Sequence, residues 1–306
     1  MHQHTRDVFI PDYDPFTQAI VEQHALALMT LPNFLICGAQ KAGTTALYAY
    51  LKQHPDVFMS RPKETWFFDR NYEKGIEWFA SHFEEHSGET AVGEATARTM
   101  SWPEAPARVA EHLPEAKLIF VLRNPIDRAY SQYHYYVYTG KEEADASFHE
   151  VIRDEQSAFG QDMIMRGRYA EQLARFDAHF DRSQMKIVLH EDLRERTTET
   201  VQEVYRFLGV DPTYEPQTEE RHNVTRYPDS LGAYYWVRRL WHLVRQGVES
   251  RFPQATDAVR QAVRRLLFSK EKPQMREDDR AYLREVFAES NARLEARLER
   301  DLSHWR

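Results

Sequence analysis

Three short apolar runs, each next to a helical pattern, constrain the fold of this chain more than any other feature. The runs cover residues 33–37, 117–122 and 186–190. Helical patterns follow them at residues 44–53, 126–138 and 198–208. Continuously apolar runs of this length are typical of strands that are buried on both faces of a parallel sheet. The sequence therefore predicts an α/β fold with a central parallel sheet flanked by helices.

The length and composition permit a full-sized core and exclude several classes of protein. The chain has 306 residues, of which 42% are hydrophobic, and its apolar runs are far shorter than the roughly 18 residues that span a bilayer. The single cysteine, Cys37, excludes an internal disulfide framework and a multi-cysteine metal site. The formal net charge of -8 argues against nonspecific nucleic-acid binding by the whole molecule. Because no signal-peptide pattern is present, we expect a cytoplasmic protein.

The turn after the first apolar run predicts a phosphate-binding loop. Its residues are Gly38, Ala39, Gln40, Lys41, Ala42, Gly43, Thr44 and Thr45. Glycines between a strand and a helix let backbone N–H groups close around a phosphate, and the helix N-terminus adds its dipole. An NTPase loop carries its lysine directly after the second glycine, whereas here Thr44 follows Gly43 and the lysine is Lys41. This displacement weakens the interpretation as a kinase or ATPase; a tight turn with an incidental lysine is the structural alternative.

A second anion site is predicted at the end of the second apolar run. Arg123 stands where an NTPase would carry an acidic residue for a metal, and Ser131 follows on the expected helix. Pro125 suits the start of that helix, so Ser131 would lie about two turns into it. An arginine at a strand end and a nearby hydroxyl can form a phosphate site. Two anion sites at one sheet edge indicate a nucleotide that is phosphorylated at two positions.

The two predicted anion sites leave two other interpretations open besides an enzyme that uses a doubly phosphorylated nucleotide. The first is a P-loop kinase or NTPase that uses magnesium-ATP, with the acidic residues of His190-Glu191-Asp192 as metal ligands after the third run. The second is a nonenzymatic regulator that binds a nucleotide and lacks a catalytic base.

Six segments of the chain resemble a known enzyme family. They are residues 34–48, RPKETWFF at 61–68, GEAT at 93–96, LRNPIDRAYSQY at 122–133, RGRYAEQLARF at 166–176 and HEDL at 190–193. In combination they are similar to PAPS-dependent sulfotransferases, in particular bacterial members and the domains that modify heparan sulfate. The resemblance implies a P-loop-like three-layer fold. It also implies transfer of a sulfuryl group from 3′-phosphoadenosine 5′-phosphosulfate (PAPS) to an acceptor hydroxyl or amine, with adenosine 3′,5′-bisphosphate (PAP) as product.

The resemblance also implies roles for individual residues. Those that would bind the 5′-phosphosulfate are Lys41, Ala42, Gly43, Thr44 and Thr45. Those that would bind the 3′-phosphate are Arg123 and Ser131, and Arg226, in a later loop that would close over the donor, is a candidate phosphate contact. Glu64, paired with Lys63, would be the general base, and no metal is required. Lys41 would stabilise the charge that develops on the leaving phosphate oxygen.

Other side chains carry weaker expectations. His134 is an alternative base, because other sulfotransferase branches use histidine, although one of 14 histidines is more often structural. Glu94 and Thr96 are expected to line the acceptor cleft, and Cys37 to be a buried, unreactive thiol. The acceptor itself remains open between a carbohydrate, a lipid and a small alcohol.

The predicted organisation is one domain over residues 1–306. It consists of an N-terminal extension (1–31), a donor-binding α/β core (32–230) and a helical C-terminal region (231–306). Residues 231–272 contain nine basic and three acidic side chains. Amphipathic packing helices are the simpler interpretation of this basic segment, and peripheral contact with a membrane is the alternative. A final helix is predicted over residues 277–305, and the sequence leaves the oligomeric state open.

Overall fold

The described part of the chain folds around one five-stranded parallel sheet. The structure, a computed structural model, describes residues 29–139, 146–218, 227–228, 268–269 and 273–305. The strands are β1 (Phe34–Gly38), β2 (Val57–Met59), β3 (Ala91–Glu94), β4 (Lys117–Leu122) and β5 (Met185–Leu189). They lie in the order β2-β3-β1-β4-β5, and every neighbouring pair is parallel. The α/β class predicted from the sequence is therefore confirmed.

The strands β1 and β4 lie in the interior of the sheet because they are apolar along their whole length. All residues of β1 are buried, and in β4 only Lys117 is partly exposed. Phe34 at the start of β1 pairs with Gly93 of β3. A Cβ atom at Gly93 would lie 2.1 Å from the ring of Phe34, so the phenylalanine packs where only a glycine leaves room.

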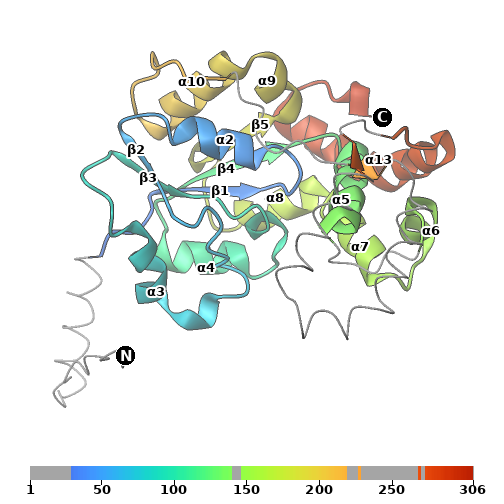
Figure 1. The fold of residues 1–306 in the computed structure, drawn as a ribbon, viewed down its shortest axis with the longest axis horizontal. Coiled ribbons are helices and arrows are strands. Elements are labelled where there is room, and N and C mark those ends of the chain that lie inside the picture. The colour runs from blue at the N-terminus through green and yellow to red at the C-terminus, as the bar shows by residue number, and fades with distance from the viewer. Residues whose placement is uncertain (1–28, 140–145, 219–226, 229–267, 270–272, 306) are drawn as a thin grey trace.

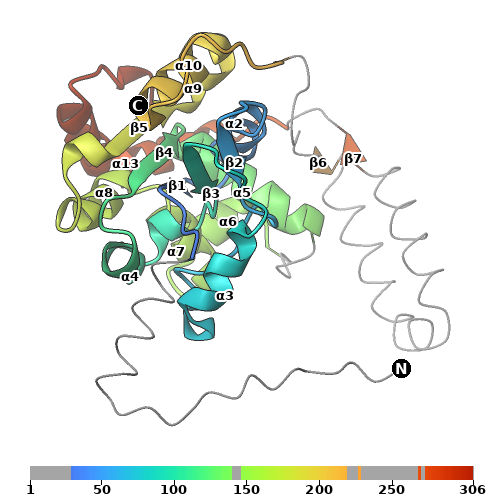
Figure 2. The same cartoon turned by 90° about the vertical axis from the view of Figure 1, so that its left-hand side faces the viewer.

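Helices cover both faces of the sheet (Figures 1 and 2). One face carries α2 (Thr44–Leu51), α9 (His190–Glu195) and α10 (Thr197–Leu208). The opposite face carries α3 (Ile76–Ala80), α4 (Ala105–His112) and α8 (Tyr169–Asp177). This arrangement is the three-layer fold that the resemblance implied.

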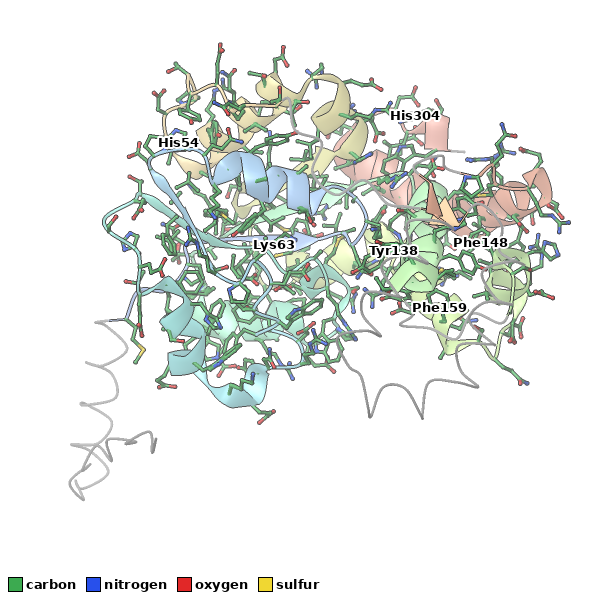
Figure 3. All side chains as sticks on the ribbon, viewed as in Figure 1. His54, Lys63, Tyr138, Phe148, Phe159 and His304 are labelled. Atoms are coloured by element: carbon green, nitrogen blue, oxygen red, sulfur yellow. The ribbon has the colours of Figure 1, made fainter. Side chains whose placement is uncertain are left out.

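A further group of helices lies beyond the end of the sheet to which the β1 arrow points in Figure 1. It consists of α5 (Pro125–Thr139), α6 (Phe148–Arg153), α7 (Ala158–Met165) and α13 (Glu277–Leu298). These helices share a second apolar core that includes Tyr133, Phe148 and Phe287. Figure 3 shows Phe148 and Phe159 beside α5, on the far side from the sheet. The carboxyl ends of the strands therefore face a packed helical group, and ligands of such sheets bind at this edge.

Two predicted helices are shorter in the structure than in the sequence interpretation. The helix expected at 44–53 ends at Leu51, and the final helix ends at Leu298. Glu299 adopts a left-handed conformation with φ 50°, which stops the final helix. Beyond it, the buried Trp305 donates its Nε1–H to a carboxylate oxygen of Glu191 at 2.7 Å. This long-range contact, which no local pattern reveals, turns the C-terminal residues back onto α9.

Several sequence predictions fall on residues outside this description. They are most of the N-terminal extension, the loop residue Arg226, and nearly all of the basic segment 231–272. Two short strands next to these residues are described: Tyr227–Pro228 (β6) and Phe268–Ser269 (β7), which form a two-stranded antiparallel sheet. None of the helices in the described ranges is long and apolar enough to cross a bilayer.

Candidate functional site

The loop between β1 and α2 is held in place through its carbonyl groups. Arg123 donates from Nη1 to the carbonyl oxygen of Lys41 at 3.2 Å, and His190 donates from Nδ1 to that of Ala42 at 2.8 Å. Across the described ranges, no protein acceptor receives the backbone N–H of Lys41 or Gly43. The N–H of Ala42 donates to the carbonyl oxygen of Ala39 at 3.1 Å, whereas the two N–H groups of Lys41 and Gly43 are available to an anion.

Gly43 and the start of α2 complete this cradle. Gly43 has φ 110°, and a Cβ atom there would lie 3.1 Å from Nδ1 of His190. Thr44, which is 4% exposed, begins α2, and Thr45 follows it on the partly exposed side. The first N–H groups of a helix have no partner within the helix and favour negative charge. The geometry therefore fits the predicted phosphate-binding loop.

Lys41 places a partly buried cation at this loop. Its Nζ lies 4.1 Å from the centroid of the Tyr135 ring, a cation–π geometry. Burial and, second, the guanidinium of Arg123 lower the pKa of Lys41 to about 8. In such surroundings the ammonium form of the lysine is disfavoured, and a bound anion would stabilise it. The site therefore holds two cationic side chains, Lys41 and Arg123, before any ligand arrives.

The predicted second anion site lies at the same edge of the sheet. Arg123 follows β4 directly, and its carbonyl oxygen accepts the hydroxyl of Tyr169 at 2.8 Å. Asn124 caps α5, because its Oδ1 accepts the N–H of Ile126 at 3.0 Å. Ser131 lies on α5 and is 1% exposed. The cap and the tyrosine fix the direction in which α5 leaves the strand, so Ser131 and Arg123 belong to one rigid connection.

Lys63 and Glu64 form an ion pair in the segment that precedes β3. Nζ of Lys63 lies 3.3 Å from Oε1 of Glu64, and the Glu64 side chain is 29% exposed. The N–H of Ala95 donates to the carbonyl oxygen of Lys63 at 3.3 Å, which ties the segment to the end of β3. Glu64 also contributes, after burial, to the raised pKa of Tyr135. Tyr135 is therefore a common neighbour of Lys41 and of the predicted base.

Glu94 is a buried anchor for this segment. It is 2% exposed, and its Oε1 accepts both the N–H of Thr65 at 2.9 Å and the hydroxyl of Thr65 at 3.0 Å. It also accepts hydrogen bonds from the N–H and the hydroxyl of Thr96. Burial raises the pKa of Glu94 to about 7, against the effect of these hydrogen bonds. Glu94 and Thr96 thus bond to the protein behind the site, and the expectation that they line an acceptor cleft receives no support from their positions.

His134 lies on a different face of α5 from Tyr135. It is 1% exposed, and its ring meets those of Tyr130 and Tyr133 at 4.4 and 5.2 Å between centroids. Tyr130 in turn packs on Phe148 of α6. These contacts favour a packing role for His134 over the alternative role as a base. Cys37 is buried as expected, and burial raises the pKa of its thiol.

The acidic residues after the third strand are already engaged. Glu191 accepts hydrogen bonds from Trp305 and His304, and Asp192 forms ion pairs with Arg300 and Arg196. These partners come mainly from the C-terminal segment. The residues that could have served as magnesium ligands therefore hold the end of the chain, which weakens the NTPase alternative.

Sequence reasoning missed a group of side chains that supports the loop. Arg166, which is 6% exposed, donates to Gln40 at 3.0 Å and to Asp162 at 2.8 Å. Asp162 also accepts a hydrogen bond from Gln132 of α5 at 2.9 Å. The contact between Arg166 and Gln40 spans 126 residues of sequence and ties the loop to the end of α7. Both residues lie in segments that carry the family resemblance, but the sequence does not show that they meet. The contact of Tyr135 with Lys41 was not predictable either, because Ser131 shares a helix face with both His134 and Tyr135.

Comparisons with known proteins identify the family of this chain. The family model described as "Sulfotransferase domain" matches residues 31–294. A mouse bifunctional heparan sulfate N-deacetylase/N-sulfotransferase 4 is 37% identical over 199 residues, which are 60% of this chain and 23% of that protein. The membrane-associated sulfotransferase kil1 of Dictyostelium discoideum is 38% identical over 135 residues, 42% of this chain and 29% of that protein. The chain thus spans less than a third of the length of these relatives.

One solved structure is similar over nearly the whole chain. It is a sulfotransferase from Alicyclobacillus acidocaldarius, with a TM-score of 0.68 and 28% sequence identity, and the match covers 90% of this chain and 99% of that one. The fold and the family match thus agree with the loop geometry described above. The chain belongs to the sulfotransferase domain family and is an enzyme of the sulfotransferase class.

Proposed function

We propose that this chain transfers a sulfuryl group from PAPS to a hydroxyl or amine of its acceptor. The observation that carries the proposal is the position of Lys41, partly buried beside Arg123 at a loop in which the N–H groups of Lys41 and Gly43 face no acceptor in the described ranges. Two cationic side chains at one sheet edge can form charge-assisted hydrogen bonds with the phosphate groups of a doubly phosphorylated donor. Family membership supports sulfuryl transfer, and the identity of the donor is our proposal.

The proposed donor contacts follow from the two anion sites. The 5′-phosphosulfate lies in the cradle formed by residues 41–45, with Lys41, Ala42, Gly43, Thr44 and Thr45 around it. The 3′-phosphate is bound by Arg123 and Ser131 on the connection from β4 to α5. Arg226 is proposed as a further phosphate contact and lies outside the described residues.

In the proposed reaction, the acceptor oxygen or nitrogen attacks sulfur in line with the leaving phosphate oxygen. One bond from the acceptor to sulfur forms, the bond from sulfur to the phosphate oxygen breaks, and PAP leaves. Glu64 takes the acceptor proton, a task for which a positioned carboxylate supplies a factor of about 10² to 10⁴. Lys41 stabilises the negative charge that develops on the leaving oxygen. The proposed mechanism uses no metal.

The acceptor class follows only in part from the relatives. The mouse relative is named as an N-sulfotransferase of heparan sulfate, which supports an amine or hydroxyl of a carbohydrate as one candidate. A lipid or a small alcohol are the other candidates. We further propose that the chain forms one domain and acts in the cytoplasm. For residues 231–272, amphipathic packing helices remain the preferred interpretation, and flotation with anionic vesicles would test the alternative of peripheral membrane contact.

Calorimetry separates the proposed donor from the alternative. We expect PAP to bind the wild-type chain without magnesium and to bind more tightly than ATP with magnesium. A preference for magnesium-ATP would overturn the proposal. Transfer of radioactive sulfate from labelled PAPS to glycans, lipid extracts or simple alcohols would then identify the acceptor class.

A further inference from the structure

The side chain of Tyr135, on α5, meets the loop between β1 and α2. It follows Ser131 by four residues, so the two side chains share one face of the helix. The preceding residue, His134, faces the second apolar core. Ser131 shares a helix face with both His134 (three residues on) and Tyr135, and it is the ring contact with Lys41 that identifies Tyr135 as the α5 side chain that meets the loop.

The ring of Tyr135 meets Lys41. The distance of 4.1 Å from Nζ to the ring centroid is short for a cation–π contact, and the side chain of Tyr135 is partly buried. Lys41 also has Arg123 nearby at the end of β4, and this like charge disfavours its ammonium form. The negative face of the aromatic ring acts in the opposite direction and favours the ammonium.

The other neighbour of Tyr135 is the proposed base. Glu64, from the segment before β3, raises the pKa of the Tyr135 phenol, after the larger effect of burial. Tyr135 thus contacts Lys41 through its ring, and the charge of Glu64 acts on its phenol, so it interacts with both groups that the proposed reaction uses.

We propose that Tyr135 is a positioning residue of the reaction centre, whose ring holds the Lys41 ammonium in place until the donor binds. The inference rests on the proposed function, because Lys41 is there the ligand of the leaving oxygen. When the donor arrives, its negative charge replaces the ring as the partner of Lys41. Without the ring, the lysine is left desolvated beside Arg123, and it either loses its proton more readily or turns toward solvent.

Three variants test this role. Tyr135→Leu removes the ring, Tyr135→Phe keeps the ring and removes the hydroxyl, and Tyr282→Leu is the matched control. The Tyr282 ring of α13 lies 4.7 Å from the guanidinium carbon of Arg153 of α6, so the control removes a partly buried cation–π ring outside the proposed site. Thermal melting of each variant checks that the fold is retained.

We expect Tyr135→Leu to lower kcat/KM for PAPS with little change in kcat, because the ring acts before the donor binds, and to move the alkaline limb of kcat/KM to lower pH. The expected movement is about half a unit to one and a half units, the size of a desolvated cation–π contact. Tyr135→Phe and the control should keep the wild-type limb. The pH-dependent rate of amine acylation at Lys41, followed by mass spectrometry without donor, should show the same movement. A purely structural role would not move either profile.

The outcomes separate the inference from the function on which it rests. If the wild-type chain binds PAP and transfers sulfate but Tyr135→Leu matches the control, the inference is overturned and the function stands. If Tyr135→Phe is as impaired as Tyr135→Leu, the hydroxyl acts rather than the ring, which also overturns the inference. A wild-type chain that fails to bind PAP overturns the proposed function together with the inference.

Discussion

The lowered pKa of Lys41 predicts that donor binding is coupled to the uptake of a proton. In the donor-free protein, burial and Arg123 lower this pKa from 10.5 to about 8. The shift corresponds to about 3 kcal/mol that disfavours the ammonium, at 1.36 kcal/mol per unit. A phosphosulfate or phosphate next to Nζ restores the ammonium, because an opposite charge within a few ångströms favours the charged form.

The size of the uptake follows from the fraction of Lys41 that is neutral before binding. With a pKa of about 8, roughly half of the molecules take up a proton at pH 8 and roughly nine-tenths at pH 9, whereas few do so at pH 7. A phosphate monoester has its second pKa near 6, so PAP itself contributes little above pH 8. His190, which also lies at the loop, has a lowered pKa and stays neutral in this range.

Calorimetric titration with PAP in buffers of different ionisation enthalpy measures this uptake directly. The matched variant is Lys41→Arg, which keeps a cation at the loop but cannot release its proton in this range. We expect uptake that rises from pH 7 to pH 9 in the wild-type chain and no such rise in the variant. Equal uptake in both proteins, or none in the wild-type chain at pH 9, would refute the assignment to Lys41.

Three other perturbations follow from the site. Glu64→Gln should lower kcat by about 10² to 10⁴ while PAP affinity stays near wild type, and kinetics and calorimetry on the exposed Glu77→Gln provide the control. Gly43→Ala should lose PAP binding and destabilise the fold by about 1–2 kcal/mol, because φ is 110° and the added Cβ meets a histidine ring. Gly88→Ala, with φ 114° and no atom within 4 Å, should show the backbone cost alone, so loss of PAP binding there would contradict the argument. Glu94 binds more protons in the folded state between pH 4.5 and about 7, so stability should fall as pH rises through this window by up to about 3 kcal/mol. Urea unfolding of Glu94→Gln should show a flatter pH profile, and an unchanged profile would remove Glu94 as its cause.

Local patterns were sufficient for the fold class and for the position of the loop proposed to bind the donor. The predicted strand at 117–122 coincides with β4, and the strand predicted at 186–190 differs from β5 by one residue at each end. The loop is recognisable because its glycines and Lys41 stand between a strand and a helix in the sequence itself. Both signals depend on residues that are close neighbours along the chain, and a single sequence carries such information directly.

Long-range contacts were not predictable in the same way. The sequence suggested that Glu94 would line the acceptor cleft, whereas four hydrogen bonds from two threonines hold it behind the site. It left Glu191 open as a magnesium ligand, whereas the carboxylate receives a hydrogen bond from Trp305. A carboxylate that binds a ligand and one that anchors the backbone have the same residue type, and only their partners distinguish them.

The sequence by itself determined that the chain has a parallel sheet and a glycine-containing loop between its first strand and the following helix, because apolar runs and glycine spacing act over a few residues. Only the tertiary structure decided which side chains meet at that loop. On α5 the choice between His134 and Tyr135 is a rotation of about 100°. Packing of α5 against α6, α7 and α13 sets that rotation, since the apolar face has to be buried. The same packing that removes the histidine from water brings the tyrosine ring to Lys41.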